Sequence, residues 1–267
     1  MTVFENVTKE DAAKLLKSGY VMQTPKTIHE DLRLSKGAVN LVLYKSGKLL
    51  IQGKDIDKVV EYLEKLKIGE LVRPEVFRKE SGWVIGTDES LKGDTFGGLV
   101  VAGVKANDKE RDGLKGLGVA DSKRLADEEI IVMAQKIKRI VPCEVKALLP
   151  EEYNHNFKNV TLLLDNLHHE VGNFLKPGKH VVDKYPGCTV GDLQVTKGES
   201  KYIEIAAASV LARAQALAQM NYLSKKAGFD LPKGSTHVKD ALLELKKKGL
   251  PLKEFIKLHF KNVQEFL

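Results

Sequence analysis

Apolar residues in the first part of the chain follow first a helical and then a strand-like spacing. The segment KEDAAKLLK has apolar residues three to four positions apart, which predicts an amphipathic helix; Thr8 and Asp11 form a capping box at its start. The runs VNLVLY (39–44) and LLIQG (49–53) flank the tetrapeptide KSGK. This pattern predicts a β-hairpin that turns at Gly47.

A second amphipathic helix is predicted in DIDKVVEYLEKLK, with Asp55 as its N-cap. Together with the first helix and the hairpin it predicts a small α/β domain over residues 1–72. Glycine, proline and charged residues follow, and we expect residues 73–82 to be a linker.

A different pattern begins at Trp83 and continues to the end of the chain. WVIGTDE (83–89) and GGLVVAGVKA (97–106) are the continuous apolar runs of buried strands. Strands that alternate with helices predict an α/β sheet with helices packed on it, here over residues 83–267. Further strands are predicted at 143–149 and 179–185, and helices at 127–139, 160–175 and 199–228.

Composition narrows the class of protein. Hydrophobic residues make up 43% of the chain and charged residues 30%, which is typical of a globular protein with a core. No apolar run approaches the roughly 20 residues that span a bilayer, and the N-terminus has no apolar signal-peptide region, so we expect no membrane association. The two cysteines, Cys143 and Cys188, cannot form a disulfide framework, and a reducing cytoplasm is the expected location.

The chain carries 43 basic and 36 acidic residues, a formal net charge of +7. An excess of Lys and Arg favours a polyanionic partner, because these residues displace counterions from phosphates. A lysine-rich solvated surface explains the same excess, so the charge alone leaves both interpretations open.

Four acidic residues stand at the ends of predicted elements. Asp88 and Glu89 end one strand, Asp183 ends another, and Glu199 opens the long predicted helix. Carboxylates gathered at such positions repel one another unless cations neutralise them, and hard divalent ions prefer oxygen ligands. Isolated acids at strand ends, or a glutamate favoured by a helix dipole, explain the same residues without a site. Neighbours in a regular strand also point to opposite faces, so Asp88 and Glu89 share a site only if the strand bends or ends there.

At these acids the sequence resembles a known family, the type 2 ribonucleases H. IGTDESLKGDTFGGLVVAG is similar to the signature of that family, and four further motifs follow in the family's order. They are GVADSKRL (118–125), HVVDKYP (180–186), KGESKYIEIAAASVLAR (197–213) and KLHFKN (257–262). The resemblance covers most of residues 83–267.

Within the family the match is to ribonuclease HIII. Glu199 stands where HII-type enzymes usually carry Asp, and the hairpin LVLYKSGKLLIQGK resembles the substrate-binding domain that precedes the HIII catalytic domain. The resemblance therefore implies a ribonuclease H-like catalytic domain, a mixed sheet flanked by helices. A small α/β domain similar in fold to the TATA-box-binding protein precedes it.

The resemblance also implies an activity: metal-dependent hydrolysis of the RNA strand of RNA/DNA hybrids, leaving 5′-phosphate ends. Asp88, Glu89, Asp183 and Glu199 would be the catalytic residues and would ligate two Mg²⁺ or Mn²⁺ ions. The implied partner is the hybrid. No obligatory protein partner is evident, and the family suggests a monomer.

Further residues match positions of the family that contact the hybrid. The loop after the first strand would approach the ribose 2′-OH, the group that distinguishes RNA from DNA. An ordinary β-turn is the alternative. Two departures bear on this loop, because the family commonly has glycine where Leu91 stands and proline where Gly98 stands. The matching positions are Lys92, Gly93 and Asp94 in the loop, and Ser122, Lys123, Ser209 and Arg213 along the hybrid groove.

Two other functions compete with this one. A ribonuclease HII-like enzyme would cut at single embedded ribonucleotides, sensing the junction with a C-terminal tyrosine; Tyr222 lies inside the long predicted helix and no tyrosine follows it. A non-catalytic nucleic-acid-binding protein would have no use for four acids in a phosphate-binding groove. Among the histidines we expect His168 and His169 on the surface of their helix, and His259 in packing or phosphate contact.

Overall fold

The computed structural model describes residues 2–16, 18–54, 56–71, 81–119 and 125–267. Contacts between Cα atoms divide the chain into two compact units, Met1–Pro74 and Glu75–Leu267. Most of the expected linker, and Asp55, Ser122 and Lys123, lie outside the described residues.

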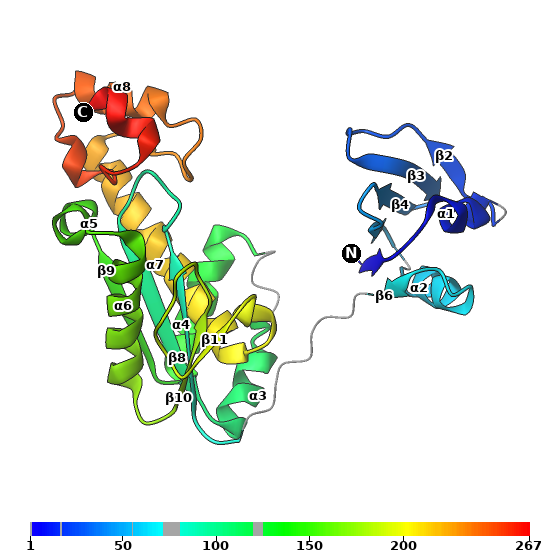
Figure 1. Ribbon diagram of the computed structural model, residues 1–267, viewed down its shortest axis with the longest axis horizontal. Helices are drawn as coiled ribbons and strands as arrows, with labels where there is room; N and C mark the ends of the chain where they lie inside the picture. Colours follow the sequence, from blue (N-terminus) through cyan, green and yellow to red (C-terminus); the bar gives the residue numbers. More distant parts are fainter. Residues whose placement is uncertain (1, 17, 55, 72–80, 120–124) are drawn as a thin grey trace. The chain divides into compact units, whose positions relative to one another are not determined.

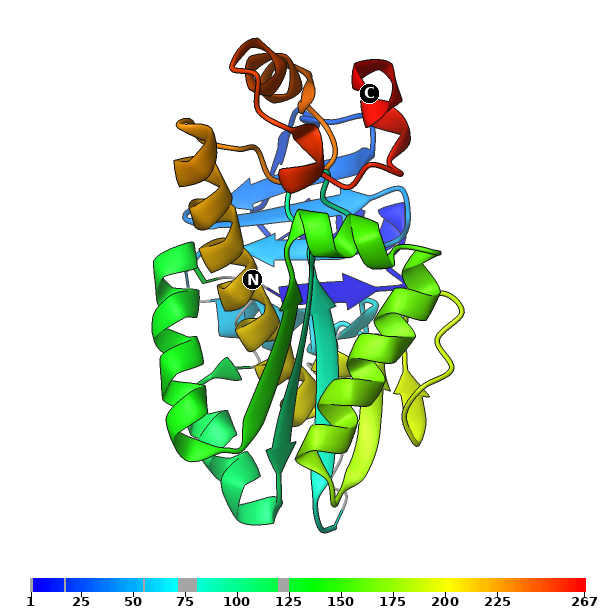
Figure 2. The same cartoon turned by 90° about the vertical axis from the view of Figure 1, so that its left-hand side faces the viewer.

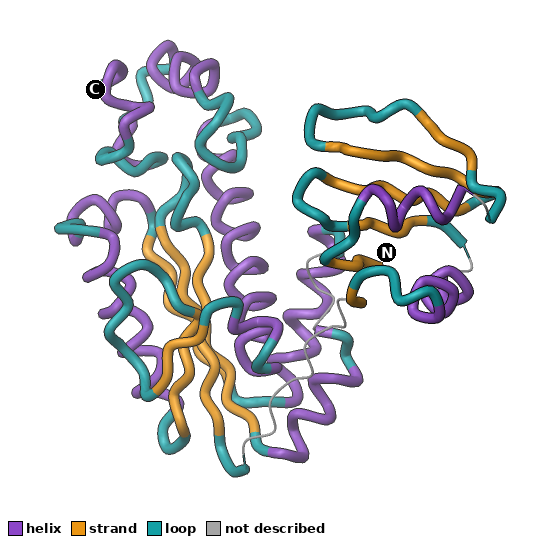
Figure 3. The backbone as a smooth tube through the Cα atoms, turned by 45° about the vertical axis from the view of Figure 1, so that its right-hand side comes forward, coloured by secondary structure: helices purple, strands orange, loops and turns teal. Residues whose placement is uncertain are grey.

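The N-terminal unit is one antiparallel sheet with two helices on one face (Figures 1 and 3). The predicted first helix and hairpin are confirmed: Thr8 Oγ1 accepts from the Asp11 backbone N at 3.1 Å, and Gly47 turns the hairpin with φ +77°. The core lies between the sheet and the helices, with Leu15, Leu41 and Leu63 all buried. In sequence order the elements are β1 (Thr2–Glu5), α1 (Lys9–Leu16), β2 (Val21–Gln23), β3 (Glu30–Lys36), β4 (Val39–Tyr44), β5 (Leu49–Gln52), α2 (Ile56–Lys65) and β6 (Glu70–Leu71).

The second unit is a five-stranded mixed sheet in the order β11-β10-β7-β8-β9, covered by helices on both faces (Figure 2). β10 runs parallel to β7, and β8 runs antiparallel to it. The strands are β7 (Val84–Ser90), β8 (Leu99–Ala106), β9 (Cys143–Leu148), β10 (Lys179–Asp183) and β11 (Leu193–Val195). The helices are α3 (Asp108–Gly116), α4 (Asp127–Ile140), α5 (Pro150–Asn156), α6 (Val160–Leu175), α7 (Ile203–Ala227) and α8 (Lys239–Lys247), with short 3₁₀ turns at η2 (Gly198–Ser200), η3 (Leu252–Glu254) and η4 (Lys261–Phe266).

The two faces of β7 have different neighbours. Ile85 packs in the core under α6, whereas Val84 packs with Tyr202 and Ile205 at the start of α7. Gly86 lets α7 approach closely, because a Cβ there would lie 2.4 Å from the Ile205 backbone N. Alternate residues of β7 therefore face α6 or α7, and this alternation extends to Asp88 and Glu89.

The mixed sheet flanked by helices confirms the fold expected for the second unit. One boundary differs: the long helix begins at Ile203, and Glu199 lies before it in η2. Within the described residues no helix has both the length and the apolar character needed to cross a membrane.

Candidate active site

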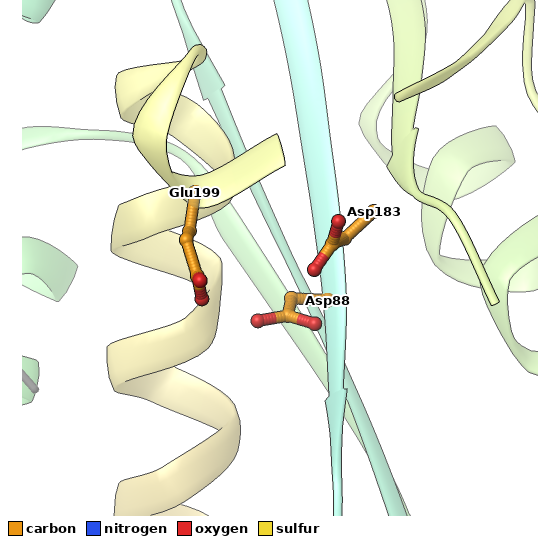
Figure 4. Close-up of side chains that lie close together, drawn as sticks. All are labelled: Asp88, Asp183 and Glu199. Atoms are coloured by element: carbon orange, nitrogen blue, oxygen red, sulfur yellow. The ribbon is translucent and has the colours of Figure 1, made fainter. Parts of the chain in front are cut away.

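Three acidic side chains converge at one end of the parallel strands β7 and β10. Asp88 comes from β7, Asp183 from the last position of β10, and Glu199 from the 3₁₀ turn η2 (Figure 4). Each offers one carboxylate oxygen, and these oxygens all lie within 4.8 Å of one another. Residues from distant parts of the sequence, positions 88, 183 and 199, therefore form one cluster of negative charge.

Backbone groups hold this cluster in place. Asp183 Oδ1 accepts from the Gly198 backbone N at 2.8 Å, which ties the end of β10 to the turn that carries Glu199. A Cβ on Gly198 would lie 2.6 Å from Ile205 Cδ1 and 3.2 Å from Asp183 Oδ1, so a larger residue there would have to displace one of these side chains. Lys197 precedes it in the left-handed region, φ 54°.

Asp88 is buried, with only 7% of its surface exposed. Burial, and then the negative charges of Glu89 and Asp183, raise the pKa of Asp88 to about 7. The Ser209 hydroxyl on α7 and the Glu89 backbone N, 2.8 Å from Asp88 Oδ1, both hydrogen-bond this carboxylate and oppose the rise. The site thus disfavours the charge that Asp88 would carry as a metal ligand, unless a cation is present.

Glu89, the fourth predicted acid, is not a member of the group of three. β7 continues in register through Ser90, so Glu89 faces α6 where Asp88 faces α7. Its Oε1 accepts from Lys92 Nζ at 2.5 Å, and its Oε2 lies 3.5 Å from His168 Nε2. Burial alone would raise the pKa of Glu89, but His168 and Lys92 outweigh it and lower the pKa.

The loop between β7 and β8 begins with a strained residue. Leu91 has φ +66°, the left-handed conformation that favours glycine, and its side chain is buried in the core beside α7. Gly93 has open space where a Cβ would be. Asp94 Oδ1 accepts from the Gly234 backbone N at 2.6 Å, which fixes the far side of the loop.

The backbone at Gly98 has no place for the proline that the sequence resemblance leads one to expect there. A Cβ there would lie 2.0 Å from the Leu148 carbonyl O, and the Gly98 N–H donates to Gln219 Oε1 at 2.7 Å. Gln219 also donates to that Leu148 carbonyl at 2.9 Å. The buried side-chain amide of Gln219 on α7 thus joins the start of β8 to the end of β9. A proline at position 98 has no N–H and could not donate to Gln219.

The predicted groove residues lie in different settings. Ser209 contacts Asp88, as described above, while Arg213 donates to Asp127 Oδ1 at 2.9 Å and to the Leu125 carbonyl at 3.1 Å. Arg213 and Lys233 line a hollow of about 220 Å³ beside the loop residue Asp94.

The sequence-based prediction for His168 was wrong. His168 is fully buried in α6, beneath β7, and only the adjacent His169 is exposed. The signal was in the spacing, because position 168 falls on the apolar stripe of α6 defined by Leu164, Leu167 and Val171. His259 packs: its ring stacks on Phe157 with centroids 3.9 Å apart.

Lys257, which the sequence did not single out, is fully buried in the C-terminal segment. Its Nζ donates to the carbonyls of Asp94 at 2.6 Å and Gly97 at 3.1 Å. Burial lowers the pKa of Lys257 to about 7. The C-terminal segment therefore fixes the loop that follows the candidate catalytic strand.

Comparisons with known proteins place this geometry in a family context. The family model described as Ribonuclease HII matches residues 85–263. A ribonuclease HIII of Bacillus cereus is 33% identical over an alignment that covers 91% of this chain and 90% of the relative. The crystal structure of Bst-RNase HIII in complex with Mn²⁺ is similar over 99% of this chain and 97% of that chain, with 25% identity and a TM-score of 0.64. The Aquifex aeolicus RNase H3 structure is similar over 97% of this chain and 100% of that chain, with 28% identity and a TM-score of 0.59.

Proposed function

Because the chain belongs to the ribonuclease HII family, and within it resembles the ribonucleases HIII, we propose that it is a metal-dependent endonuclease that hydrolyses the RNA strand of RNA/DNA hybrids and leaves 5′-phosphate ends. The observation that carries the proposal is the convergence of Asp88, Asp183 and Glu199 within 4.8 Å. A protein that only bound nucleic acid would gain nothing from three carboxylates in a groove that must accept phosphates.

The donor set fits Mg²⁺ or Mn²⁺. Three carboxylates supply the oxygen ligands that hard divalent ions prefer. Burial, and then the charges of Glu89 and Asp183, raise the pKa of Asp88, and a bound cation would offset both effects. We assign Asp88, Asp183 and Glu199 as ligands of two ions, and we assign Glu89, which lies outside this group of three, as the fourth ligand that the family resemblance implies. Ions bound there would activate the attacking water and neutralise charge on the phosphate.

The chain's own residues prepare these ligands. The Ser209 hydroxyl and the Glu89 backbone N hold the Asp88 carboxylate, and the Gly198 N–H holds Asp183 through Oδ1. The cluster is thus oriented before any ion binds, which lowers the cost of ordering it during catalysis.

Selection of RNA is assigned to the loop after β7. Lys92, Gly93 and Asp94 would place their backbone against the ribose, and the open space at Gly93 allows that approach. Arg213, with Ser122 and Lys123 from the family motif, would contact the phosphates along the groove.

Residues 1–72 would hold the hybrid, with residues 73–82 as linker and residues 83–267 as catalytic domain. The face of the N-terminal sheet opposite the helices is partly polar: Asn40 and Gln52 are paired across β4 and β5, and both are exposed. Amides on a flat sheet can donate to phosphates and sugars without reading sequence. Substituting both by Glu would lower the affinity for the hybrid without changing the cleavage rate at saturation.

We propose a preference for runs of ribonucleotides over a single embedded one, because Tyr222 is half-exposed on α7 and no tyrosine follows it to serve as a junction sensor.

The two unpaired cysteines, Cys143 and Cys188, suit a reducing cytoplasm. A monomer with no obligatory protein partner is the simplest assembly for this site.

The test is cleavage of matched hybrids that carry one, four or many ribonucleotides, with Mg²⁺, Mn²⁺ or EDTA. We expect metal-dependent cleavage that favours the longer runs of ribonucleotides. Asp88→Asn should abolish this cleavage. Asp112→Asn should leave it unchanged, because Asp112 is an exposed aspartate paired with Lys115. Cleavage that persists in the Asp88→Asn variant would refute the assignment of this cluster as the active site. Equal rates on one and many ribonucleotides would indicate the HII-like activity, and metal-independent binding without cutting would indicate a non-catalytic protein.

A further inference from the structure

Three buried polar side chains form a row of hydrogen bonds on the face of β7 that α6 covers. Thr87 and His168 are fully buried, and His180 is 6% exposed. Thr87 Oγ1 lies 2.8 Å from His168 Nδ1 and 2.9 Å from His180 Nε2. The other ring nitrogen of His168, Nε2, is buried without a hydrogen-bond partner of good geometry among the described residues and lies 3.5 Å from Glu89 Oε2.

If His168 is to donate a hydrogen bond to Glu89, each donor and acceptor in this row of side chains is fixed. A threonine hydroxyl has one proton, so Thr87 donates to one imidazole and accepts from the other. A carboxylate only accepts, so the nitrogen that faces Glu89 must carry a proton. In a neutral His168 the proton is then on Nε2, and Nδ1 accepts from Thr87. Thr87 in turn accepts from His180 Nε2–H.

The surroundings of His180 fit this direction. Burial lowers the pKa of His180 to about 4, so at neutral pH its ring has a single proton to donate. The ring lies against Gly172 of α6, where a Cβ would be 2.4 Å from Nδ1. A glycine inside a helix is destabilising relative to alanine, and here it makes room for the His180 ring.

We infer that His168 is a positioning residue for Glu89: its Nε2–H faces and orients the carboxylate, and Thr87 and His180 fix the tautomer that makes it a donor. The inference rests on the proposed function in one respect, since it gives Glu89 a role as metal ligand. Lys92 holds Oε1 and His168 faces Oε2, so both oxygens of a carboxylate that is 10% exposed have a donor beside them. Outer partners of this kind orient metal ligands and tune metal affinity.

The first test needs neither metal nor activity. In the metal-free, full-length protein, ¹⁵N NMR of the imidazoles should show His168 with a protonated Nε2 and an unprotonated Nδ1. Thr87→Val keeps the shape of the side chain but removes the hydroxyl, and it should shift His168 away from that tautomer. A wild-type His168 that is protonated on Nδ1 and unprotonated on Nε2 would overturn the inference, because a lone pair would then face Glu89.

The second test separates orientation from packing. The amide of His168→Gln reaches the position of Nε2 and can donate to Glu89, whereas that of His168→Asn reaches only the position of Nδ1. In a Mn²⁺ titration without substrate, His168→Asn should bind about tenfold more weakly. His168→Gln should stay within about threefold of wild type, as should the control His169→Gln on the exposed side of α6.

The two substitutions are also compared by urea unfolding. Equal losses of Mn²⁺ affinity in His168→Gln and His168→Asn would overturn the inference, because they would indicate a packing role alone. Failure of the wild-type protein to bind Mn²⁺ would instead contradict the proposed function. The tautomer measurement would then still decide which nitrogen of His168 faces Glu89.

Discussion

Replacing Asp88 by Asn should stabilise the metal-free protein while it removes the proposed metal ligand. Asn has the shape of Asp but no charge, and Asp88 is buried beside Glu89 and Asp183. A carboxyl whose pKa is raised by folding binds its proton more tightly in the folded state. Stability from this group is therefore present at low pH and is lost as pH rises through about 7.

The magnitude follows from the two pKa values. An unfolded-state pKa of 3.8 and a folded-state pKa of about 7 correspond to a penalty of about 4 kcal/mol at pH 8. The same linkage gives roughly 1–2 kcal/mol at pH 5 and less than about 1 kcal/mol at pH 4. Relaxation of the surroundings reduces such values, so we expect Asp88→Asn to gain roughly 2–4 kcal/mol at pH 8, falling with pH.

Urea unfolding in EDTA measures this gain. Trp83 is the only tryptophan of the chain and stands directly before β7, so its fluorescence reports on the unit that contains the site. Wild type and Asp88→Asn are compared at pH 8, 5 and 4, with Asp112→Asn as the matched control. That aspartate is exposed, and its substitution should change stability by less than about 0.5 kcal/mol at each pH.

A variant no more stable than wild type at pH 8 would show that Asp88 is not held as a destabilised anion. A gain that is equal at pH 8 and pH 4 would show that it comes from packing and not from charge. Either result would refute the electrostatic description of the cluster.

Three further substitutions test the loop between β7 and β8. Gly98→Ala should destabilise by about 2–4 kcal/mol in urea unfolding, because its Cβ would lie 2.0 Å from the Leu148 carbonyl O; an unchanged midpoint would contradict this close contact. A Cβ at position 93 would meet nothing within 4 Å, so Gly93→Ala should change the free energy of unfolding by less than about 0.5 kcal/mol. It should nevertheless raise KM for the hybrid, and an unchanged KM would argue against contact between this backbone and the substrate. Leu91→Gly relieves about 1 kcal/mol of backbone strain at φ +66° but exposes a cavity, so we expect a net loss of about 2 kcal/mol; a net gain would mean that strain outweighs burial.

Much of the catalytic unit could be predicted because its signals are local. Continuous apolar runs mark β7 and β8, and the acids that end predicted strands mark the site. The position of Glu199 was harder to predict, because a helix-like sequence pattern continues through a 3₁₀ turn. The contact of Gly198 with Asp183 ties that turn to β10. That contact joins distant segments and has no local signature.

His168 shows where the sequence was misjudged. Two adjacent histidines in the middle of a helix, without ligand spacing, were expected on the surface, although position 168 falls on the buried stripe of α6. Its partner Thr87, and His180 beyond it, come from two different strands and become neighbours because β7 and β10 pair. Lys257 is a similar case, since its buried ammonium is matched by loop carbonyls about 160 residues earlier in the chain.

Anomalous diffraction from crystals soaked in Mn²⁺ would test most directly whether Asp88, Asp183 and Glu199 form a metal centre. We predict an anomalous peak within bonding distance of carboxylate oxygens from all three residues, lost in crystals of Asp183→Asn. A peak elsewhere, or a fully soaked crystal with no peak between these side chains, would contradict the assignment of this cluster as the catalytic metal site.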